Sequence, residues 1–328
     1  MAVSRRSLEP LVSVVVATYG RASLLPRLVA ALEAQQGGES FEVIIVDDCS
    51  RDETDAVLRR LAVTTSLDLR HYRLDTNYGP ATARNLGWRH ARGEQILFTD
   101  DDCTPQPGWV AAMANGLAEA DIVQGKTLPD PAQAANLGPF SHTMHVKGEN
   151  GLYATCNIGY RRGVLERVGG FDERFRHPYG EDSDLAWRAR EAGAATAFER
   201  AALVYHDVRP PSARAHLRDL RRRGGIVRLV AVHPGMRSRL ERGVFLRASH
   251  PPALLAGSGL ALLFGGHRPR TRLLGAALVL PYVRHRHHHP LPGSADSSVA
   301  DLALALASDL AEIGVLALAS VRSRTLVL

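Results

Sequence analysis

Polar and acidic side chains follow short apolar runs at three places in the first third of the sequence. Residues 17–19 end the run that begins at Leu11, residues 47–48 follow the run 43–46, and residues 100–102 follow the run 95–98. Ligands of open α/β sheets bind at the carboxyl ends of the strands. If the apolar runs are strands of one sheet, these polar residues meet at one edge and form a ligand site.

The acidic triplet Asp100-Asp101-Asp102 indicates a cation site. Three adjacent carboxylates repel one another, and a cation or a set of hydrogen-bond donors offsets that cost. Oxygen ligands suit Mg²⁺ or Mn²⁺, and such an ion neutralises a diphosphate and makes it a better leaving group. An acidic turn that caps a helix from about Pro107 is the structural alternative. His206, at the end of the run 203–205, could complete a metal shell or contact a phosphate, although a lone histidine is more often structural.

Three further side chains could hold a nucleotide. Ser50 and Glu53 have the spacing of a capping box, which leaves Asp48 available to accept hydrogen bonds from a base. Tyr19 could offer its ring to that base, and Arg84 could pair with a phosphate. A strand-to-helix turn, a half-buried aromatic ring and a surface salt bridge are the respective structural alternatives.

The segment Gly180-Glu181-Asp182-Ser183-Asp184 places carboxylates at the start of an expected helix. The helix dipole stabilises their charged form there, and that alone would explain them. An ionised carboxylate beside an acceptor hydroxyl is also what a general base requires. The segment is therefore a candidate catalytic site.

The elements around these residues have the pattern of an α/β domain. Apolar runs over about 11–17, 43–46 and 95–98 predict buried strands, a further strand is expected near 69–72, and the segments between them have helical spacing. We expect a Rossmann-like, mostly parallel sheet with helices on both faces, and a nucleotide-binding half over residues 11–102. The expected helices cover 24–32, 52–61, 80–91 and 182–191, and a strand over 195–205 closes an acceptor half over 103–210.

The composition changes after residue 210. Between Arg209 and Arg247 there are eleven arginines and two acids, whereas the whole chain of 328 residues has a net charge of +6. Apolar blocks at 253–264 and 273–283 are shorter than a membrane-spanning helix, and the block 299–319 is longer but carries acids and is therefore amphipathic. We expect a helical, Arg-rich extension over 211–328. Packing on the catalytic domain and dimerisation both fit these blocks, but we favour association with an anionic membrane interface.

The cysteines and the N-terminal residues bear on the compartment. Cys49, Cys103 and Cys156 are far apart and have no zinc-like spacing, which fits a reducing compartment. Arg5 and Arg6 precede an apolar run, as in a signal peptide, but that run is short and ends at a turn, so we interpret it as a strand. We expect a cytoplasmic catalytic part, peripheral on the inner face of the membrane.

In their order along the chain these motifs resemble the family 2 glycosyltransferases, which have the GT-A fold. The resemblance rests on residues 14–20, 46–50, 77–85, 98–102 with Gly108-Trp109, 169–172 and 181–188, and it covers about 10–207. Gly20 stands where many members have Asn. The triplet allows two registers of the family's DxD metal motif, so Asp101 and Asp102 both stay open as the main metal ligand.

The resemblance implies an inverting displacement on a nucleoside-diphosphate sugar. An acceptor hydroxyl on a glycan, a lipid-linked glycan or a small molecule would give its proton to Asp182, with Asp184 in reserve, and Mg²⁺ or Mn²⁺ would assist the leaving diphosphate. The resemblance and the motifs together assign Ala17, Thr18, Tyr19, Asp48, Arg84, Asp100 and Asp101 to the nucleotide, Asp102 and His206 to the metal, and Trp109, Asn157, Glu181 and Asp184 to the acceptor side.

Two other classes of protein share some of these features. A nucleotidyltransferase that makes activated sugars also combines a Rossmann-like half with acidic metal ligands, but residues 17–22 contain one glycine instead of a glycine-rich loop. A non-enzymatic protein that binds lipid or nucleic acid would explain the basic segment and leave the acidic motifs unexplained. We expect no nucleic-acid partner. The donor sugar, the acceptor and the oligomeric state are not encoded in these motifs.

Overall fold

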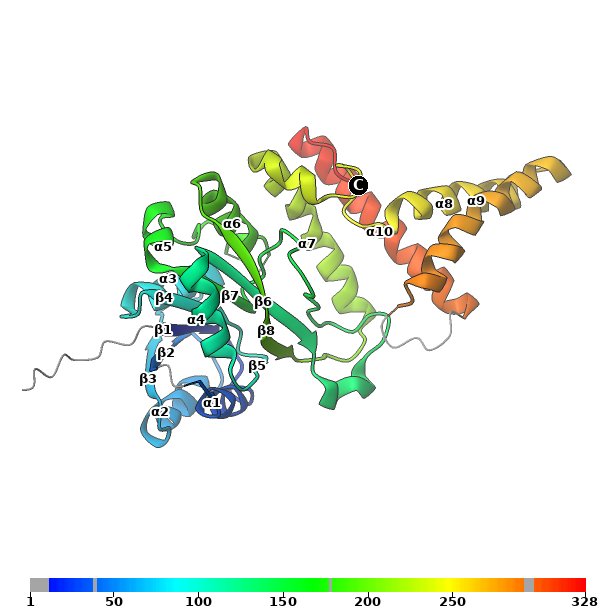
Figure 1. Cartoon of the computed structure of the whole chain (residues 1–328). Coiled ribbons are helices and arrows are strands. Elements are labelled where there is room, and N and C mark those ends of the chain that lie inside the picture. The colour runs from blue at the N-terminus through cyan, green and yellow to red at the C-terminus, as the bar shows by residue number, and fades with distance from the viewer. Residues whose placement is uncertain (1–11, 38–39, 177–178, 292–297) are drawn as a thin grey trace, which may run out of the picture. The chain divides into compact units, whose positions relative to one another are not determined.

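The computed structural model describes residues 12–37, 40–176, 179–291 and 298–328 (Figure 1). Arg5, Arg6 and Leu11 lie outside these ranges. The chain divides into an α/β unit (residues 1–131 and 144–207) and a helical unit (132–143 and 208–328). The boundary expected at residue 210 lies close to Asp207, but residues 132–143, expected in the catalytic domain, cluster with the helical unit.

The α/β unit contains an eight-stranded sheet in the order β3-β2-β1-β4-β7-β6-β8-β5. The strands β1 (Val12–Thr18), β2 (Phe41–Asp47), β3 (Asp68–Arg73) and β4 (Gln95–Thr99) are parallel, as the apolar runs predicted. Their carboxyl ends therefore lie at one edge of the sheet.

The rest of the sheet is mixed, so the predicted mostly parallel character holds only for its first part. β7 (Asn157–Arg161) runs antiparallel to both β4 and β6 (Ile122–Pro129). β8 (Thr196–His206) is parallel to β6, and β5 (Cys103–Pro105) is antiparallel to β8. The segment between β6 and β7 contains the 3₁₀ turn η1 (Pro131–Asn136) and no described α-helix. Without a helical crossover, neighbouring strands pair antiparallel more readily.

Helices cover both faces of the sheet (Figure 1). Alternate residues of β1 and β2, such as Val14 and Val43, join the core beneath α1 (Leu25–Glu33), α2 (Thr54–Thr64) and α4 (Trp109–Glu119). The intervening residues face α3 (Pro80–His90), where Gly87 lets the helix approach Val15 and Val46 closely. α5 (Arg162–Val168) and α6 (Glu181–Glu191) complete the unit. The predicted fold class is confirmed in this form.

Two predicted helix starts differ from the structure. α2 begins after Glu53, and no side-chain hydrogen bond caps it. Ser50 instead donates to Asp47 and accepts from the main chain of Gly20, so the predicted capping box is wrong. α4 begins at Trp109 after the left-handed Gly108, with no acid in its first turn and no side-chain cap. The acidic triplet therefore does not cap α4, and the structural alternative for it is removed.

The helical unit consists of α7 (Ala213–Val232), the turn η2 (Pro234–Arg239), α8 (His250–Gly265), α9 (Pro269–His288) and α10 (Val299–Ser323). α10 packs against α7 and α8. It is also the one described helix long and apolar enough to cross a membrane, a test that core helices of soluble proteins pass too. Its acids Asp309 and Glu312 are buried within this unit. The prediction that this block is amphipathic is therefore wrong in its usual sense, because these acids are buried while Val299, Leu318 and Val321 are exposed.

Candidate active site

The acidic triplet lies at the end of β4, beside the end of β1. Thr18 Oγ1 donates to Asp101 Oδ2 at 2.7 Å, and Arg21 lies 3.6 Å from Asp102. Both carboxylates are buried. Burial, followed by the neighbouring Asp102 charge, raises the pKa of Asp101 to about 7. The pair of carboxylates therefore resists full ionisation unless positive charge lies next to it.

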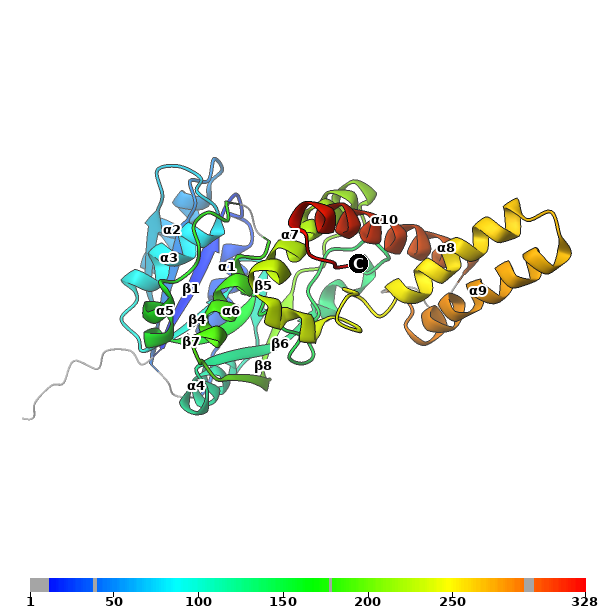
Figure 2. The ribbon, with the colours of Figure 1, turned by 90° about the horizontal axis from the view of Figure 1, so that it is seen from above.

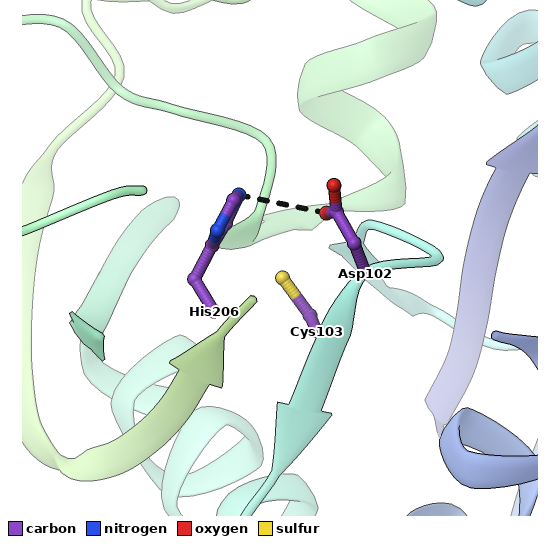
Figure 3. A group of neighbouring side chains, drawn as sticks. All are labelled: Asp102, Cys103 and His206. Atoms are coloured by element: carbon purple, nitrogen blue, oxygen red, sulfur yellow. Dashed lines mark ion pairs between the residues drawn. The ribbon is translucent and has the colours of Figure 1, made fainter. Parts of the chain in front are cut away.

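Asp102 and His206 form the candidate metal centre. β5 pairs with β8 so that Cys103 lies opposite His206, and ligand atoms of Asp102, Cys103 and His206 lie within 4.8 Å of one another (Figure 3). Asp102 Oδ1 is 3.5 Å from His206 Nε2. Burial raises the pKa of Cys103 well above its usual range, so its thiol stays protonated and is a poor ligand.

The histidine is oriented by its other ring nitrogen. His206 Nδ1 lies 2.8 Å from the carbonyl oxygen of Asp207, which can only accept, so Nδ1 carries the proton. In the neutral ring, Nε2 then presents its lone pair toward the Asp102 carboxylate. A main-chain carbonyl that fixes the tautomer in this way is typical of metal-binding histidines. The donor set of one carboxylate and one imidazole thus fits a divalent ion.

Arg84 joins the triplet to the start of α6. Its guanidinium is buried and donates to Asp100 Oδ1 and to Glu181 Oε1, both at 2.9 Å. The predicted alternative of a surface salt bridge is wrong, because the bridge is internal. Arg84 is engaged by two carboxylates, so a phosphate contact would require it to exchange one of them. We call the linked set of Thr18, Arg21, Arg84, the triplet, Glu181, Asp182 and His206 the carboxylate network.

Asp182 lies in the first turn of α6, directly after Glu181. The side chain keeps some exposure to solvent, and its Oδ1 accepts a hydrogen bond of 2.7 Å from the main chain of Ser183. Burial of the carboxyl group, followed by the Glu181 charge, raises the pKa of Asp182 to about 7. A carboxyl group that titrates near neutral pH suits general-base chemistry. Asp184 is instead paired with Arg188 at 2.8 Å within the same helix.

The predicted nucleotide side contains one open and one enclosed side chain. Tyr19 is 47% exposed, so its ring is accessible. Asp48 is buried, and its carboxylate accepts hydrogen bonds of 2.8 Å from the main chains of Tyr78 and Gly79. Burial raises the pKa of Asp48. Asp48 therefore anchors the loop before α3. Ala17 lies one residue before the end of β1.

Trp109 and Asn157 lie inside the α/β unit. Trp109 Nε1 donates to Asn157 Oδ1 at 2.8 Å, and Asn157 Nδ2 donates to the carbonyl oxygens of Lys126 and Ala202, both at 2.9 Å. Neither side chain has solvent exposure. They hold β6, β7 and β8 together in this structure, and contact of either with an acceptor stays a prediction.

Sequence reasoning missed Arg21. This arginine follows β1 by three residues and is the cation nearest to Asp102 among the described ion pairs. An arginine in a turn is common, and nothing in its spacing distinguishes it. Only the sheet order, which places β1 beside β4, brings it to the triplet.

Solved structures of other proteins share this fold. The mannosyltransferase PcManGT from Pyrobaculum calidifontis, in complex with GDP-Man and Mn²⁺, matches with a TM-score of 0.55 and 20% identity over 96% of this chain and 87% of that one. TarS 1-349 from S. aureus, in complex with UDP-GlcNAc, matches with a TM-score of 0.53 and 20% identity over 96% and 92%. The fold is that of the GT-A glycosyltransferases.

The sequence comparisons identify the family. Residues 13–169 match the family model described as Glycosyl transferase family 2. The pre-mycofactocin glycosyltransferase of Mycobacterium tuberculosis is 30% identical over 215 residues, which cover 60% of this chain and 43% of that protein. The succinoglycan biosynthesis protein ExoO of Rhizobium meliloti is 32% identical over 217 residues, which cover 60% and 61%. These matches show a family 2 glycosyltransferase region over residues 13–169, and the chain spans about half the length of these relatives.

Proposed function

We propose that the chain transfers a sugar from a nucleoside-diphosphate sugar to an acceptor hydroxyl. The observation that carries this proposal is the carboxylate network, in which Arg84 ties the acidic triplet to the helix that bears Asp182. Two structures of the same fold were solved with sugar nucleotides, GDP-Man and UDP-GlcNAc, which supports a donor of this class. The comparisons do not favour a nucleotidyltransferase or a non-enzymatic binding protein.

Asp102 and His206 are the residues that would hold a divalent ion. A carboxylate and an imidazole lone pair that face each other at 3.5 Å fit a cation between them. Because Mg²⁺ prefers oxygen ligands, the nitrogen donor favours Mn²⁺. When bound, the ion would offset the charge of the diphosphate and stabilise the departing nucleoside diphosphate.

Asp182 is the proposed general base of an inverting displacement. Its ionised carboxylate takes the proton of the acceptor hydroxyl while that oxygen attacks the anomeric carbon, and the bond from this carbon to the diphosphate oxygen breaks. Asp184 is the weaker candidate because Arg188 already pairs with its carboxylate. The Arg84 cation offsets the charge of Glu181 beside Asp182, which keeps the ionised base accessible.

Tyr19 and Asp48 are the proposed contacts to the nucleoside. The exposed ring of Tyr19 offers a flat surface to a base. Asp48 holds the loop that enters α3 through its two main-chain hydrogen bonds, and its carboxylate has lone pairs left to accept from a base. The side chains of Thr18 and Arg21 would position the triplet from the opposite side.

We propose a cytoplasmic location, with the chain peripheral on the inner face of a membrane. Three free cysteines in the described residues support a reducing compartment. The apolar and basic composition of residues 250–289 supports contact with a membrane.

A donor screen tests the proposed activity. The full chain with Mn²⁺ is incubated with UDP-sugars and GDP-sugars, and release of nucleoside diphosphate is measured by chromatography. We expect one donor to be consumed, Asp102→Asn to abolish its consumption, and Glu166→Gln, on the exposed surface of α5, to leave it unchanged. The proposal fails if no sugar nucleotide is consumed and no nucleoside diphosphate with Mn²⁺ raises the melting temperature.

A further inference from the structure

α8 and α9 form an antiparallel hairpin (Figure 2). Many of its exposed side chains are apolar. The two helices meet closely at Gly259 and Gly275, where a Cβ on Gly259 would lie 2.6 Å from the Gly275 carbonyl oxygen. Helices of a hairpin that is exposed to water normally have polar side chains on the solvent-facing side. Here the exposed large apolar side chains are Leu254, Leu255, Phe264, Leu273, Leu274, Leu280 and Val283, with Phe264 85% and Leu273 75% exposed.

The charges of this hairpin all have one sign. Residues 250–289 contain five arginines and six histidines and no Asp or Glu. Arg268, Arg270 and Arg272 lie at the turn between the helices, and all three are exposed. Arg284 and the histidines 287–289 lie at the far end of α9. Cations therefore flank the exposed apolar surface at both ends.

We propose that the α8–α9 hairpin docks into the interface of an anionic membrane, with its apolar side chains at the acyl boundary and its arginines on lipid phosphates. This deepens the proposed membrane location and does not depend on the proposed transfer reaction. The apolar stretch 273–283 of α9 is roughly 16 Å long at about 1.5 Å per residue. Since the hydrocarbon core is about 30 Å thick, the hairpin lies along the surface and does not span it.

A hollow beside the hairpin is lined by the same two kinds of side chain, basic and apolar. It is shallow and lies where the first turn of α8 meets the last turns of α9, and its lining contains cations and apolar side chains but no acid. Such a lining suits a phosphate headgroup above an acyl chain. The residues that line it are Arg242, Pro251, Pro252, Leu255, Pro281, Arg284, His285, His288 and His289.

Among the described helices, α10 is the one that is long and apolar enough to span a membrane, but it is less suited to contact lipid. Glu312 of α10 is paired with Arg223 and Arg247, and Asp309 is paired with Arg286. These pairs hold α10 within the helical unit, and lipid around α10 would separate the charges at high cost. The hairpin needs no such rearrangement.

Charge also favours lipid over a second copy of this chain. Two hairpins face to face would bring arginines against arginines with no acid in either segment to pair with them. Like charges in contact oppose association. An anionic lipid surface, in contrast, attracts each basic residue by roughly 1 kcal/mol, or about fivefold in partitioning.

Vesicle flotation with the full chain tests this proposal. The probes are vesicles of phosphatidylcholine alone and vesicles that also contain phosphatidylglycerol. We expect binding to the second kind only. The triple change Arg268→Glu, Arg270→Glu and Arg272→Glu should lower binding by about a hundredfold or more. Phe264→Ser with Leu273→Ser should also lower it, and consumption of a soluble donor should stay unchanged in all variants.

Matched controls separate the hairpin from the rest of the surface. Arg218→Glu changes an exposed arginine of α7, and Val63→Ser changes an apolar side chain of α2 that is 83% exposed. Both should bind vesicles as the unaltered chain does, and circular dichroism should show all variants folded. The proposal is overturned if the hairpin variants bind anionic vesicles as the unaltered chain does. It is also overturned if the unaltered chain does not bind anionic vesicles. Hairpin variants that then alter the oligomer mass in light scattering would indicate that the hairpin mediates self-association.

Discussion

The three carboxylates of the triplet are adjacent in sequence but reach different partners. Asp100 pairs with Arg84 of α3, Asp101 accepts from Thr18 of β1, and Asp102 lies between Arg21 and His206. The first two carboxylates accept hydrogen bonds from protein donors, whereas the third lies beside both the Arg21 guanidinium and the His206 imidazole. This arrangement favours Asp102 over Asp101 as the main metal ligand, a choice that the sequence left open.

Replacement of the proposed base is the first test at this scale. Asp182→Asn keeps the size of the side chain and removes its ability to take a proton. We expect kcat to fall roughly 10³-fold, since general-base groups contribute about 10²–10⁴-fold. Affinity for the sugar nucleotide, measured by calorimetry with Mn²⁺, should stay within about twofold of the unaltered chain. If Asp182→Asn keeps its kcat and Asp184→Asn loses it, the general base is Asp184 and not Asp182.

The raised pKa of Asp182 predicts a pH dependence. Burial of this carboxyl group raises its pKa from 3.8 to about 7, so the base is protonated and inactive below neutral pH. We expect kcat/KM to rise about tenfold per pH unit up to an apparent pKa near 7. Because the native state holds this proton more tightly than the unfolded chain, ionisation destabilises the fold between about pH 4 and 7. Above pH 7, Asp182→Asn should therefore unfold no more easily than the unaltered chain, as thermal denaturation would show.

At the scale of elements, the loop before α3 depends on one glycine. Gly79 has φ +95°, and a Cβ there would collide with the main-chain oxygen of Arg176. Its amide also donates to Asp48. We expect Gly79→Ala to lower the free energy of unfolding by about 2 kcal/mol, because both strain and a steric clash oppose it.

Urea denaturation of the full chain measures this effect. Gly148→Ala is the matched control, because Gly148 has ordinary backbone angles and open space around it. It should change stability by less than about 0.5 kcal/mol. If the two variants have equal free energies of unfolding, the backbone at residue 79 accommodates a side chain without loss of stability.

The elements that could be predicted are those with a local signal. β1, β2 and β4 contain apolar runs rich in valine, isoleucine and leucine, and the helices between the strands have apolar periodicity. β3 is more polar, and its strand is expected from its place in the alternating pattern. β5 and β7 are short and owe their pairing to distant partners, so no local pattern marks them. The capping role predicted for Ser50 was wrong for the same reason. Its hydroxyl accepts a hydrogen bond from the main chain of Gly20, thirty positions earlier, and does not cap α2.

The residues of the candidate site were selected from the sequence, whereas their pairings could not be predicted, and the assigned roles stay predictions. Strand-end position and the family resemblance pointed to the triplet, Asp182 and His206. The internal bridge from Arg84 to Glu181 joins residues 97 positions apart, and only the folded chain brings them together. The burial of Trp109 and Asn157 likewise follows from how β6, β7 and β8 meet.

At the scale of the whole molecule, the helical unit depends on a buried carboxylate. Burial alone would raise the pKa of Glu312, but His250, Arg247 and Arg223 outweigh it and lower the pKa to about 2. A lowered pKa stabilises the fold fully above the unfolded value of 4.5, and this contribution is lost as the pH falls toward 2. We expect Glu312→Gln to cost about 2 kcal/mol at neutral pH and less at pH near 3.

Chemical denaturation followed by helix content checks this expectation. Glu241→Gln, at an exposed acid of the same unit, is the control and should have little effect at either pH. A cost for Glu312→Gln that is the same at both values of pH would show that the ion pairs contribute nothing. The sequence revealed the acids of α10 as an amphipathic pattern, and only the packing of α7, α8 and α9 shows which arginines they meet.

Strand β7 reverses the direction of the sheet after the four parallel strands. The register of β1, β2, β3 and β4 is set by parallel pairing and carries the triplet and the loop held by Asp48. The long connection between β6 and β7 lies outside these parallel pairings, and β7, which follows it, runs antiparallel to β4 and β6. Insertions or exchanges in that connection can therefore change its length without shifting the register of these four strands. The length of this connection can thus vary between related chains while the strand ends that carry the triplet keep their positions.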